Sequence, residues 1–481
     1  MGKRLQLVAI TALVTVAGQS VVSIDAAVAA AKPVKAKTVK AKPVKPKTVT
    51  SKPVTTTSVT TTSLAPVKVK QFGPNTTNVT PFASVANVYG EFLQRVGADL
   101  DAFWTAELPF TFGQGFNGLF GFFPYSRQTL PPNCGRVRVP SYRVVQGNAF
   151  YCRDSDYIAF DNDGLFPEVY SEYGASALGV ILAHEYGHAI QARTGLSLSG
   201  ALNETQADCF SGAWLKRVTT GGSPTVSIPM GDLDTILQAM LTFRDTPGTG
   251  GTSLGAHGTG FDRVAGLQLG YDFGASRCAA FATNPPTLVA KGFEDQERAN
   301  RGNVPYAEAL EIAIRTTAQH FVASFPALTA TVVTATDPDT VLASTASCPG
   351  GVTVFGDLLG VCPGDTVTLP TIVYSRERMQ RVYSRLGDAA VGYVHALGWA
   401  TLASVRQGRE TAKSSPIGET RTICLAASWY RWFGVDARET LSSGDIDEGI
   451  FTVLSLQGAS SSFDRVRALR VGFESGINAC S

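Results

Sequence analysis

The stretch Ala177-Leu178-Gly179-Val180-Ile181-Leu182-Ala183-His184-Glu185-Tyr186-Gly187-His188 is the most informative part of this 481-residue chain. A largely apolar run typical of a buried helix leads directly into two histidines four positions apart. On a helix of 3.6 residues per turn, such positions lie about 40° apart on one face, so both imidazoles can bind one metal ion. Glu185 lies about 100° further round, where it can accept a proton from a water at that metal.

A second polar stretch, Asn203-Glu204-Thr205-Gln206-Ala207-Asp208, follows His188. Its composition predicts a helix start with Asn203 at the N-cap. Glu204 and Asp208 then share a face, which suits a third metal ligand followed by a carboxylate that accepts the outer N–H of a ligand histidine. The helix dipole alone would also favour an acid at Glu204. The spacing predicts a site of two histidines and one glutamate with a position open for water.

At these residues the sequence resembles the bacterial neutral zinc metallopeptidases, zincins with a His-Glu-x-x-His helix and a thermolysin-like glutamate as third ligand. The resemblance covers residues 82 to 281. It implies that His184, His188 and Glu204 bind one Zn2+ and that Glu185 is the general base. It also implies that an edge strand just before the metal helix aligns an extended peptide. Flanking stretches that carry the likeness are Asp101-Ala102-Phe103-Trp104, Ala149-Phe150-Tyr151-Cys152, residues 206–214, His257-Gly258-Thr259 and Asp262-Arg263-Val264.

The chain also repeats itself. Phe261-Asp262-Arg263-Val264 recurs as Phe463-Asp464-Arg465-Val466, and residues 173–195 align without gaps on residues 386–408. Glu204 corresponds to Glu419 in the same way. A repeat of this length predicts a duplicated domain rather than a solenoid.

The second copy lacks the residues that would bind a metal. His184, Glu185 and His188 correspond to Leu397, Gly398 and Thr401, and Asp208 corresponds to Ile423. Zinc is therefore expected in the first copy only, one ion per chain. The Asp-Arg pairs at 262–263 and 464–465 persist in both copies, as expected for a structural ion pair.

His257 is also lost, since it corresponds to Ala459. This joint loss makes His257 a candidate for donating a hydrogen bond to the oxyanion that forms during hydrolysis, although a lone histidine is often structural. His320 and His395 have no metal partner nearby in the sequence and are expected to be structural.

The chain is expected to be exported, so its eight cysteines are expected to form disulfides. Eight cysteines can be paired in 105 different ways. Because the four cysteines of one copy correspond in order to the four of the other, each copy is expected to pair its own four in the same way. The predicted pairs are Cys134 with Cys152, Cys209 with Cys278, Cys348 with Cys362, and Cys424 with Cys480. No two cysteines in the sequence have the Cys-x-x-Cys spacing that zinc sites made of cysteines favour.

The N-terminal region indicates export. Lys3 and Arg4 precede an apolar run, and Ala27 and Ala29 offer a cleavage site, so residues 1–29 are expected to be a secretory signal peptide. Residues 30–70 contain ten Lys and no acidic or aromatic residue, which predicts a disordered linker. It is expected to act as a solvated spacer or, alternatively, to contact an anionic cell surface. The lysines of such a linker do not indicate nucleic-acid binding, and no transmembrane span is expected in the mature chain.

These patterns predict a helix-rich α+β fold with two domains. Residues 71–283 would form a zincin-like metallopeptidase domain, and residues 284–481 a degenerate copy that binds no metal. We expect a secreted enzyme that hydrolyses peptide bonds in a peptide or protein substrate. The alternatives are a hydrolase of cell-wall peptides and a zinc-containing protein, cell-wall-associated or otherwise, that binds a partner without catalysis.

Overall fold

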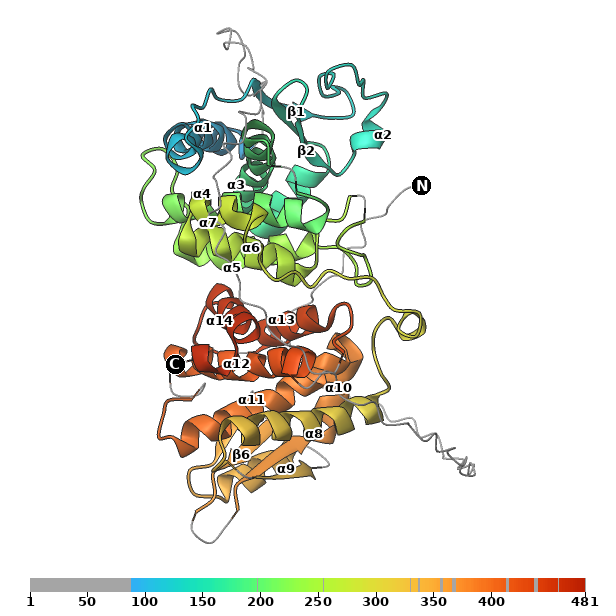
Figure 1. Ribbon diagram of the computed structural model, residues 1–481, viewed down its shortest axis with the longest axis vertical. Helices are drawn as coiled ribbons and strands as arrows, with labels where there is room; N and C mark the ends of the chain where they lie inside the picture. Colours follow the sequence, from blue (N-terminus) through green and yellow to red (C-terminus); the bar gives the residue numbers. More distant parts are fainter. Residues whose placement is uncertain are drawn as a thin grey trace, which may run out of the picture. The chain divides into compact units, whose positions relative to one another are not determined.

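The protein is a helix-rich α+β structure in which two small sheets are each covered by helices (Figure 1). The computed structural model describes residues 88–480, except residues 197, 254, 329, 336–337, 355–357, 366–368, 412–414, 437–439 and 457. The expected signal peptide and linker lie outside the described residues. We call residues 88–283 the first half and residues 284–480 the second half. Their described residues belong to one compact unit.

The first half carries most of its helices after its strands. Its elements are α1 (Gly90–Phe112), β1 (Gly121–Tyr125), α2 (Tyr142–Val145), β2 (Ala149–Cys152), β3 (Tyr157–Asp161), α3 (Leu165–Thr194), α4 (Ala201–Thr219), η1 (Met230–Asp232), α5 (Leu233–Thr242), α6 (Gly260–Phe273), α7 (Ala275–Ala279) and η2 (Ala280–Ala282).

The second half presents a similar order, from a helix through a sheet to a group of helices. Its elements are η3 (Arg298–Asn300), α8 (Tyr306–Ser324), β4 (Thr331–Ala335), α9 (Pro338–Ala346), β5 (Val352–Val354), β6 (Leu359–Cys362), β7 (Thr371–Ser375), α10 (Arg376–Leu386), α11 (Asp388–Arg406), α12 (Pro416–Arg431), η4 (Trp432–Asp436), α13 (Asp445–Ser455), α14 (Ser462–Ser475) and η5 (Ile477–Ala479).

The two sheets share a topology. In the first, the strand order is β1-β3-β2, with β1 parallel and β2 antiparallel to β3. In the second, β4, β7 and β6 repeat that order and those directions, and β5 adds a fourth strand beside β6. The strand directly before the metal helix is therefore the middle strand β3. The expectation of an edge strand at that place was wrong, because the edge strands of this sheet are β1 and β2.

Helix α3 carries the two histidines and packs against both the sheet and α4. Its backbone leaves the helical conformation at Gly174 (φ 79°), and Gly195 (φ 69°) ends it. Both histidines lie in the part of the helix beyond this break. A Cβ at residue 187 would lie 2.8 Å from the Cα of Ala207. Gly187 therefore lets α3 and α4 approach closely enough for the histidines to reach Glu204.

Helix α4 begins earlier than the sequence predicts. Gly200 is its N-cap, so Asn203 lies inside the first turn. The amide of Ala201 donates to the carbonyl of Gly251 in a loop that follows much later in the chain (2.8 Å). This long-range bond sets the start of α4, and the prediction of Asn203 as N-cap was wrong.

The four predicted disulfides are confirmed. Cys134 pairs with Cys152, Cys209 with Cys278, Cys348 with Cys362, and Cys424 with Cys480. In each half the long pair ties the helix that carries the equivalent glutamate in its first turn to the end of that half. Each disulfide contributes about 2–4 kcal/mol to the free energy of unfolding.

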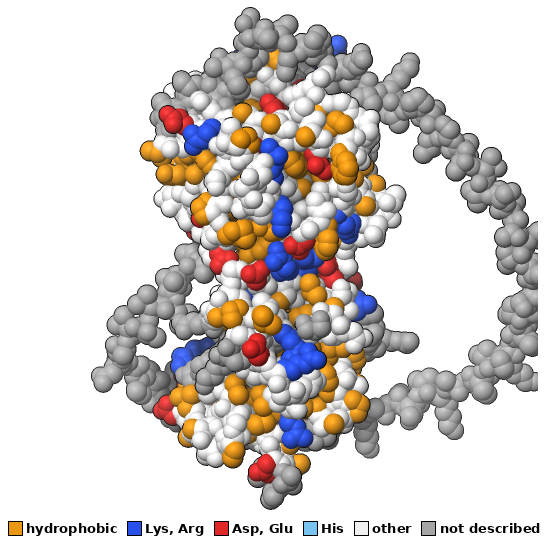
Figure 2. Space-filling model, turned by 90° about the vertical axis from the view of Figure 1, so that its left-hand side faces the viewer, with side chains coloured by type: hydrophobic (Ala, Val, Ile, Leu, Met, Phe, Trp, Pro, Cys, Tyr) orange, Lys and Arg blue, Asp and Glu red, His pale blue; other side chains and the backbone are white. Residues whose placement is uncertain are grey.

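Helices α5 and α6 of the first half pack against α13 and α14 of the second (Figure 1). Ion pairs join the halves, with Asp272 bound to both Arg467 and Arg470 at 2.9 Å. Figure 2 shows acidic and basic side chains gathered side by side where the halves meet on one face. None of the described helices combines the length and apolar character that a membrane span requires.

Candidate metal centre

Three side chains from two helices converge in the first half. His184 Nε2 lies 3.3 Å from Glu204 Oε2, and His188 Nε2 lies 3.5 Å from Glu204 Oε1. In a tetrahedral site with metal–ligand distances of about 2.0–2.1 Å, neighbouring ligand atoms lie about 3.3–3.4 Å apart. The donor set and its spacing therefore fit a single divalent ion, and the structure brings together the three ligands that the sequence predicts.

Asp208 holds the first histidine from behind. Its Oδ1 lies 2.7 Å from His184 Nδ1, and Arg263 binds both oxygens of the same carboxylate, at 2.9 and 3.0 Å. All three side chains are buried. An ionised carboxylate only accepts, so His184 donates from Nδ1, and its Nε2 is directed toward the position between the candidate ligands. This is the arrangement predicted for Asp208.

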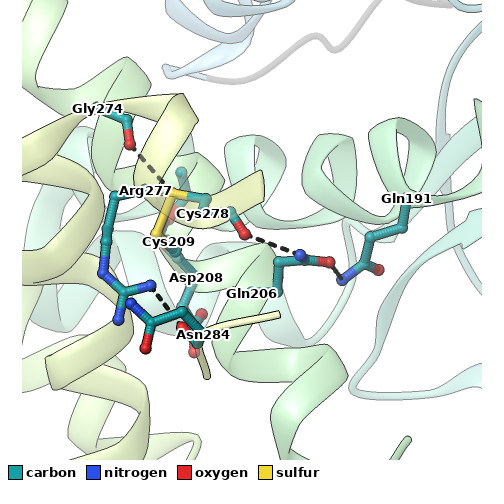
Figure 3. Close-up of a disulfide and its surroundings, with 9 residues drawn as sticks. Gln191, Gln206, Asp208, Cys209, Gly274, Arg277, Cys278 and Asn284 are labelled. Atoms are coloured by element: carbon teal, nitrogen blue, oxygen red, sulfur yellow. Dashed lines mark hydrogen bonds between the residues drawn. A yellow bond between two sulfur atoms is a disulfide. The ribbon is translucent and has the colours of Figure 1, made fainter. Parts of the chain in front are cut away.

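Gln191 holds the second histidine in the same way. Its Oε1 lies 2.8 Å from His188 Nδ1, while its Nε2 donates to the carbonyl of Asn203 and to Oε1 of Gln206. Gln206 donates in turn to the carbonyl of Cys278 (2.9 Å). Figure 3 shows Gln191 and Gln206 leading toward the Cys209–Cys278 disulfide. That disulfide thus fixes the support of a candidate ligand as well as the end of the domain.

The site attracts positive charge. Burial alone would lower the pKa of His184, but the carboxylates of Asp208 and Glu204 raise it to about 10. Burial also opposes protonation of His188, yet Glu204 raises its pKa. Despite burial, both histidines hold the pKa of Glu204 well below its usual range. Two carboxylates thus stabilise either protons on the imidazoles or a cation between them.

Glu185 is positioned differently from the ligands. It is buried, and its negative charge contributes to the raised pKa of the neighbouring His188. Within the described residues, no hydrogen-bond donor or ion-pair partner contacts its carboxylate. A carboxylate that is buried without a partner beside a metal site remains free to exchange a proton with a water molecule.

His257 lies outside this cluster, on the loop before α6. Its Nδ1 is 3.5 Å from Oδ1 of Asp245, and the side chain is 50% exposed. Asp245 also accepts the backbone amides of His257 (2.7 Å) and Gly258 (3.0 Å). These contacts fix the loop, but none of them joins His257 to the three candidate ligands.

An open cleft of about 430 Å³ runs beside the site. Two of the candidate ligands reach it, and the edge strand β2 and the loop before His257 form its walls. Its lining residues are Tyr151, Arg153, His188, Gln191, Ala192, Leu196, Leu198, Gly200, Asn203, Glu204, Gly255 and Ala256. A ligand in this cleft would contact the metal position from one side and the strand from the other.

The equivalent place in the second half has another arrangement. Glu419 Oε1 lies 2.7 Å from Arg465 Nε, and Oε2 accepts the amides of Ala459 and Ser460, both at 2.8 Å. The arginines that follow Asp262 and Asp464 therefore pair with carboxylates of another helix. The prediction of Asp-Arg ion pairs was wrong, because Asp262 caps α6 together with Thr259.

The described residues include one other group of acids that could hold a cation: Asp388, Asp445 and Glu448. Each of these carboxylates accepts a backbone amide, from Val304, Ser442 and Ala390 respectively. The amides lie near helix starts, which accounts for the acids without a metal.

Three supporting residues were missed by the sequence reasoning. Gln191 follows His188 by three positions, so helical spacing alone could have indicated it. Arg263 was assigned to the wrong carboxylate. Asp245 gave no local signal, because its contact with His257 depends on the path of a loop.

Comparisons with known proteins leave the function open. No protein-family model and no solved structure matches the chain. It is similar to uncharacterized proteins of Mycobacterium bovis and of two Mycobacterium tuberculosis strains, with 27% identity over 152 residues. The match covers 26% of this chain and 52% of each relative. The chain thus spans about half the length of the curated relatives it matches.

Proposed function

We propose that the protein is a secreted zinc-dependent metallopeptidase. The observation that carries the proposal is the convergence of His184, His188 and Glu204, with Glu185 buried and unpaired beside them. Two imidazoles and one carboxylate form a donor set that suits zinc. Zinc, when bound, supplies a Lewis acid that lowers the pKa of a water and polarises a carbonyl group.

In this proposal the chain's own residues handle the proton and the substrate. Glu185 takes a proton from the attacking water and returns it to the leaving amine. Asp208 and Gln191 keep both imidazoles oriented with Nε2 toward the site. His257, held by Asp245, donates a hydrogen bond to the carbonyl oxygen as negative charge develops there.

The cleft supports a peptide as the substrate. Strand β2 pairs with β3 on one side only within the described residues, and Tyr151 and Arg153 at its end line the cleft. An extended peptide can add to such an edge through backbone hydrogen bonds. Its carbonyl groups would then pass beside His188 and Glu204.

We further infer that the two halves are copies of one zincin-like domain and that the second has lost its metal site. The shared strand order and the equivalent helices support this inference. So do the disulfides, which pair alike in both halves. Those disulfides and the absence of a spanning helix from the described residues are consistent with an extracellular location.

The test compares wild type with Glu185→Gln on unstructured peptides and on cell-wall peptides. The variant should retain its metal and lose hydrolysis by about 10²- to 10⁴-fold, the usual contribution of a general base. Cleavage of wall peptides alone would assign the narrower substrate. Full activity of the variant, or of chelated wild type, would refute the peptidase, and bound metal without any turnover would leave a binding protein.

A further inference from the structure

The second half supplies a carboxylate to the start of α6 in the first half. Asp447 of α13 accepts the amides of Gly260 (2.9 Å) and Phe261 (2.8 Å). Its side chain is only 6% exposed, and Arg244 lies 3.7 Å from it. The first amides of a helix have no partner within the helix, and the helix dipole favours negative charge there. Asp447 therefore fixes the position at which α6 begins.

Helix α6 leads directly to the candidate metal centre. Arg263, in its first turn, binds both oxygens of Asp208, and Asp208 contacts His184 at 2.7 Å. The guanidinium also donates to the carbonyl of Phe243 (3.0 Å), so its position is fixed on two sides. An unbroken series of contacts thus runs from Asp447 through α6 and Asp208 to a metal ligand.

The contact has a counterpart in the opposite direction. Asp234 of α5, in the first half, accepts the amides of Ser462 and Phe463 at the start of α14, both at 2.9 Å. The aromatic contacts are reciprocal too, since Phe261 packs on Phe473 and Tyr271 on Phe463. This is the pattern of a two-fold interface, in which equivalent residues exchange roles.

Asp234 and Asp447 differ in the contacts made by the helix that each of them holds. Asp234 and Asp447 occupy equivalent places in the repeated sequences Gly231-Asp232-Leu233-Asp234 and Gly444-Asp445-Ile446-Asp447. Helix α14, held by Asp234, carries Arg465, whose partner is Glu419 rather than a carboxylate that holds a histidine. The chain therefore contains its own control for the effect of Asp447.

We propose that Asp447 is a positioning residue for the metal centre. By holding α6 it keeps Arg263 and Asp208 in place behind His184, so the second half sets the metal affinity of the first. This inference rests on the proposed zinc site but not on peptide hydrolysis.

The test uses Asp447→Asn and Asp234→Asn in the full chain. Each change keeps the side-chain shape and one acceptor but removes the charge. Zn2+ affinity is measured by competition with a chelator of known affinity. Asp447→Asn should weaken binding by about 3- to 10-fold, less than the roughly 10- to 100-fold expected for a residue that touches a ligand. Asp234→Asn should bind like wild type.

Equal affinities in the two variants would overturn the inference and leave the zinc site standing. A wild-type chain that binds no Zn2+ would refute both. If Asp447→Asn does not fold, hydrogen exchange in wild type decides, because coupling between two sites is reciprocal. Zn2+ should then slow exchange at Gly260 and Phe261 more than at Ser462 and Phe463, and equal slowing at both pairs would overturn the proposal.

Discussion

Glu204 in the first half and Glu419 in the second belong to the first turns of equivalent helices, yet their carboxylates have different partners. Glu204 faces two imidazoles, whereas Glu419 pairs with Arg465. In the first half the equivalent arginine, Arg263, is already bound by Asp208. In the second half Ile423 stands at the place of Asp208, and Arg465 pairs with Glu419 instead. A metal centre in this framework therefore needs two carboxylates, one for the arginine and one for the metal.

The largest effect should come from Glu419→Gln. Arg465 is 7% exposed and cannot lose its charge, so removing its partner should lower the free energy of unfolding by about 3–5 kcal/mol. Glu204→Gln should remove the metal but cost less stability, because histidines can release their protons. Denaturant unfolding of both variants without metal measures the difference. Equal losses would mean that the two glutamates have the same role.

The second largest effect should be a loss of stability of the second half in acid. Burial lowers the pKa of His320 and of His395 to about 4, below the unfolded value of 6.5. The unfolded chain then binds more protons between pH 4 and 6.5, so stability is lost as pH falls through this window, by up to about 3 kcal/mol per histidine. His184, with its raised pKa, acts oppositely in metal-free protein: its contribution is full below pH 6.5 and is lost as pH rises toward 10.

His395→Leu tests the acid effect, because neither ring nitrogen of the buried His395 has a hydrogen-bond partner among the described residues. Unfolding of wild type and variant in urea is compared at pH 7 and pH 5. The variant should lose less stability between the two values. An unchanged pH dependence would show that His395 is not the acid-sensitive group.

Asp208→Asn should weaken Zn2+ binding by about 10- to 100-fold, since it removes the charge that orients His184 and pairs with Arg263. Ile423→Val, at the equivalent place, should bind zinc like wild type. Chelator competition measures both. A normal affinity for Asp208→Asn would reduce Asp208 to a residue that only packs.

The smallest difference between the halves should be in the stability lost when the equivalent helix caps are removed. Thr259 accepts the amide of Asp262, and Ser461 accepts that of Asp464. Replacing either with Ala should cost about 1 kcal/mol. Thermal unfolding of the two variants should give similar losses, and a large difference would argue against equivalent roles for α6 and α14.

Local spacing, together with the family resemblance, was sufficient to predict that His184, His188 and Glu204 lie together. Helical periodicity placed His184 and His188 on one face, and the repeat supplied the disulfide pairing. Contacts set by the packing of distant segments could not be predicted in this way. Gly251 decides where α4 begins, and Arg263 reaches across to α4 instead of pairing with its neighbour. The sequence contains the repeated Gly-Asp-Leu-Asp and Gly-Asp-Ile-Asp. Only the structure shows that Asp234 and Asp447 in these repeats accept helix-start amides of the opposite half.

Metal content tests the central claim most directly. Elemental analysis of the purified full chain should find one zinc per chain in wild type and in Glu419→Gln, and none in Glu204→Gln. Two zinc ions per wild-type chain, none at all, or zinc retained after Glu204→Gln would contradict the account.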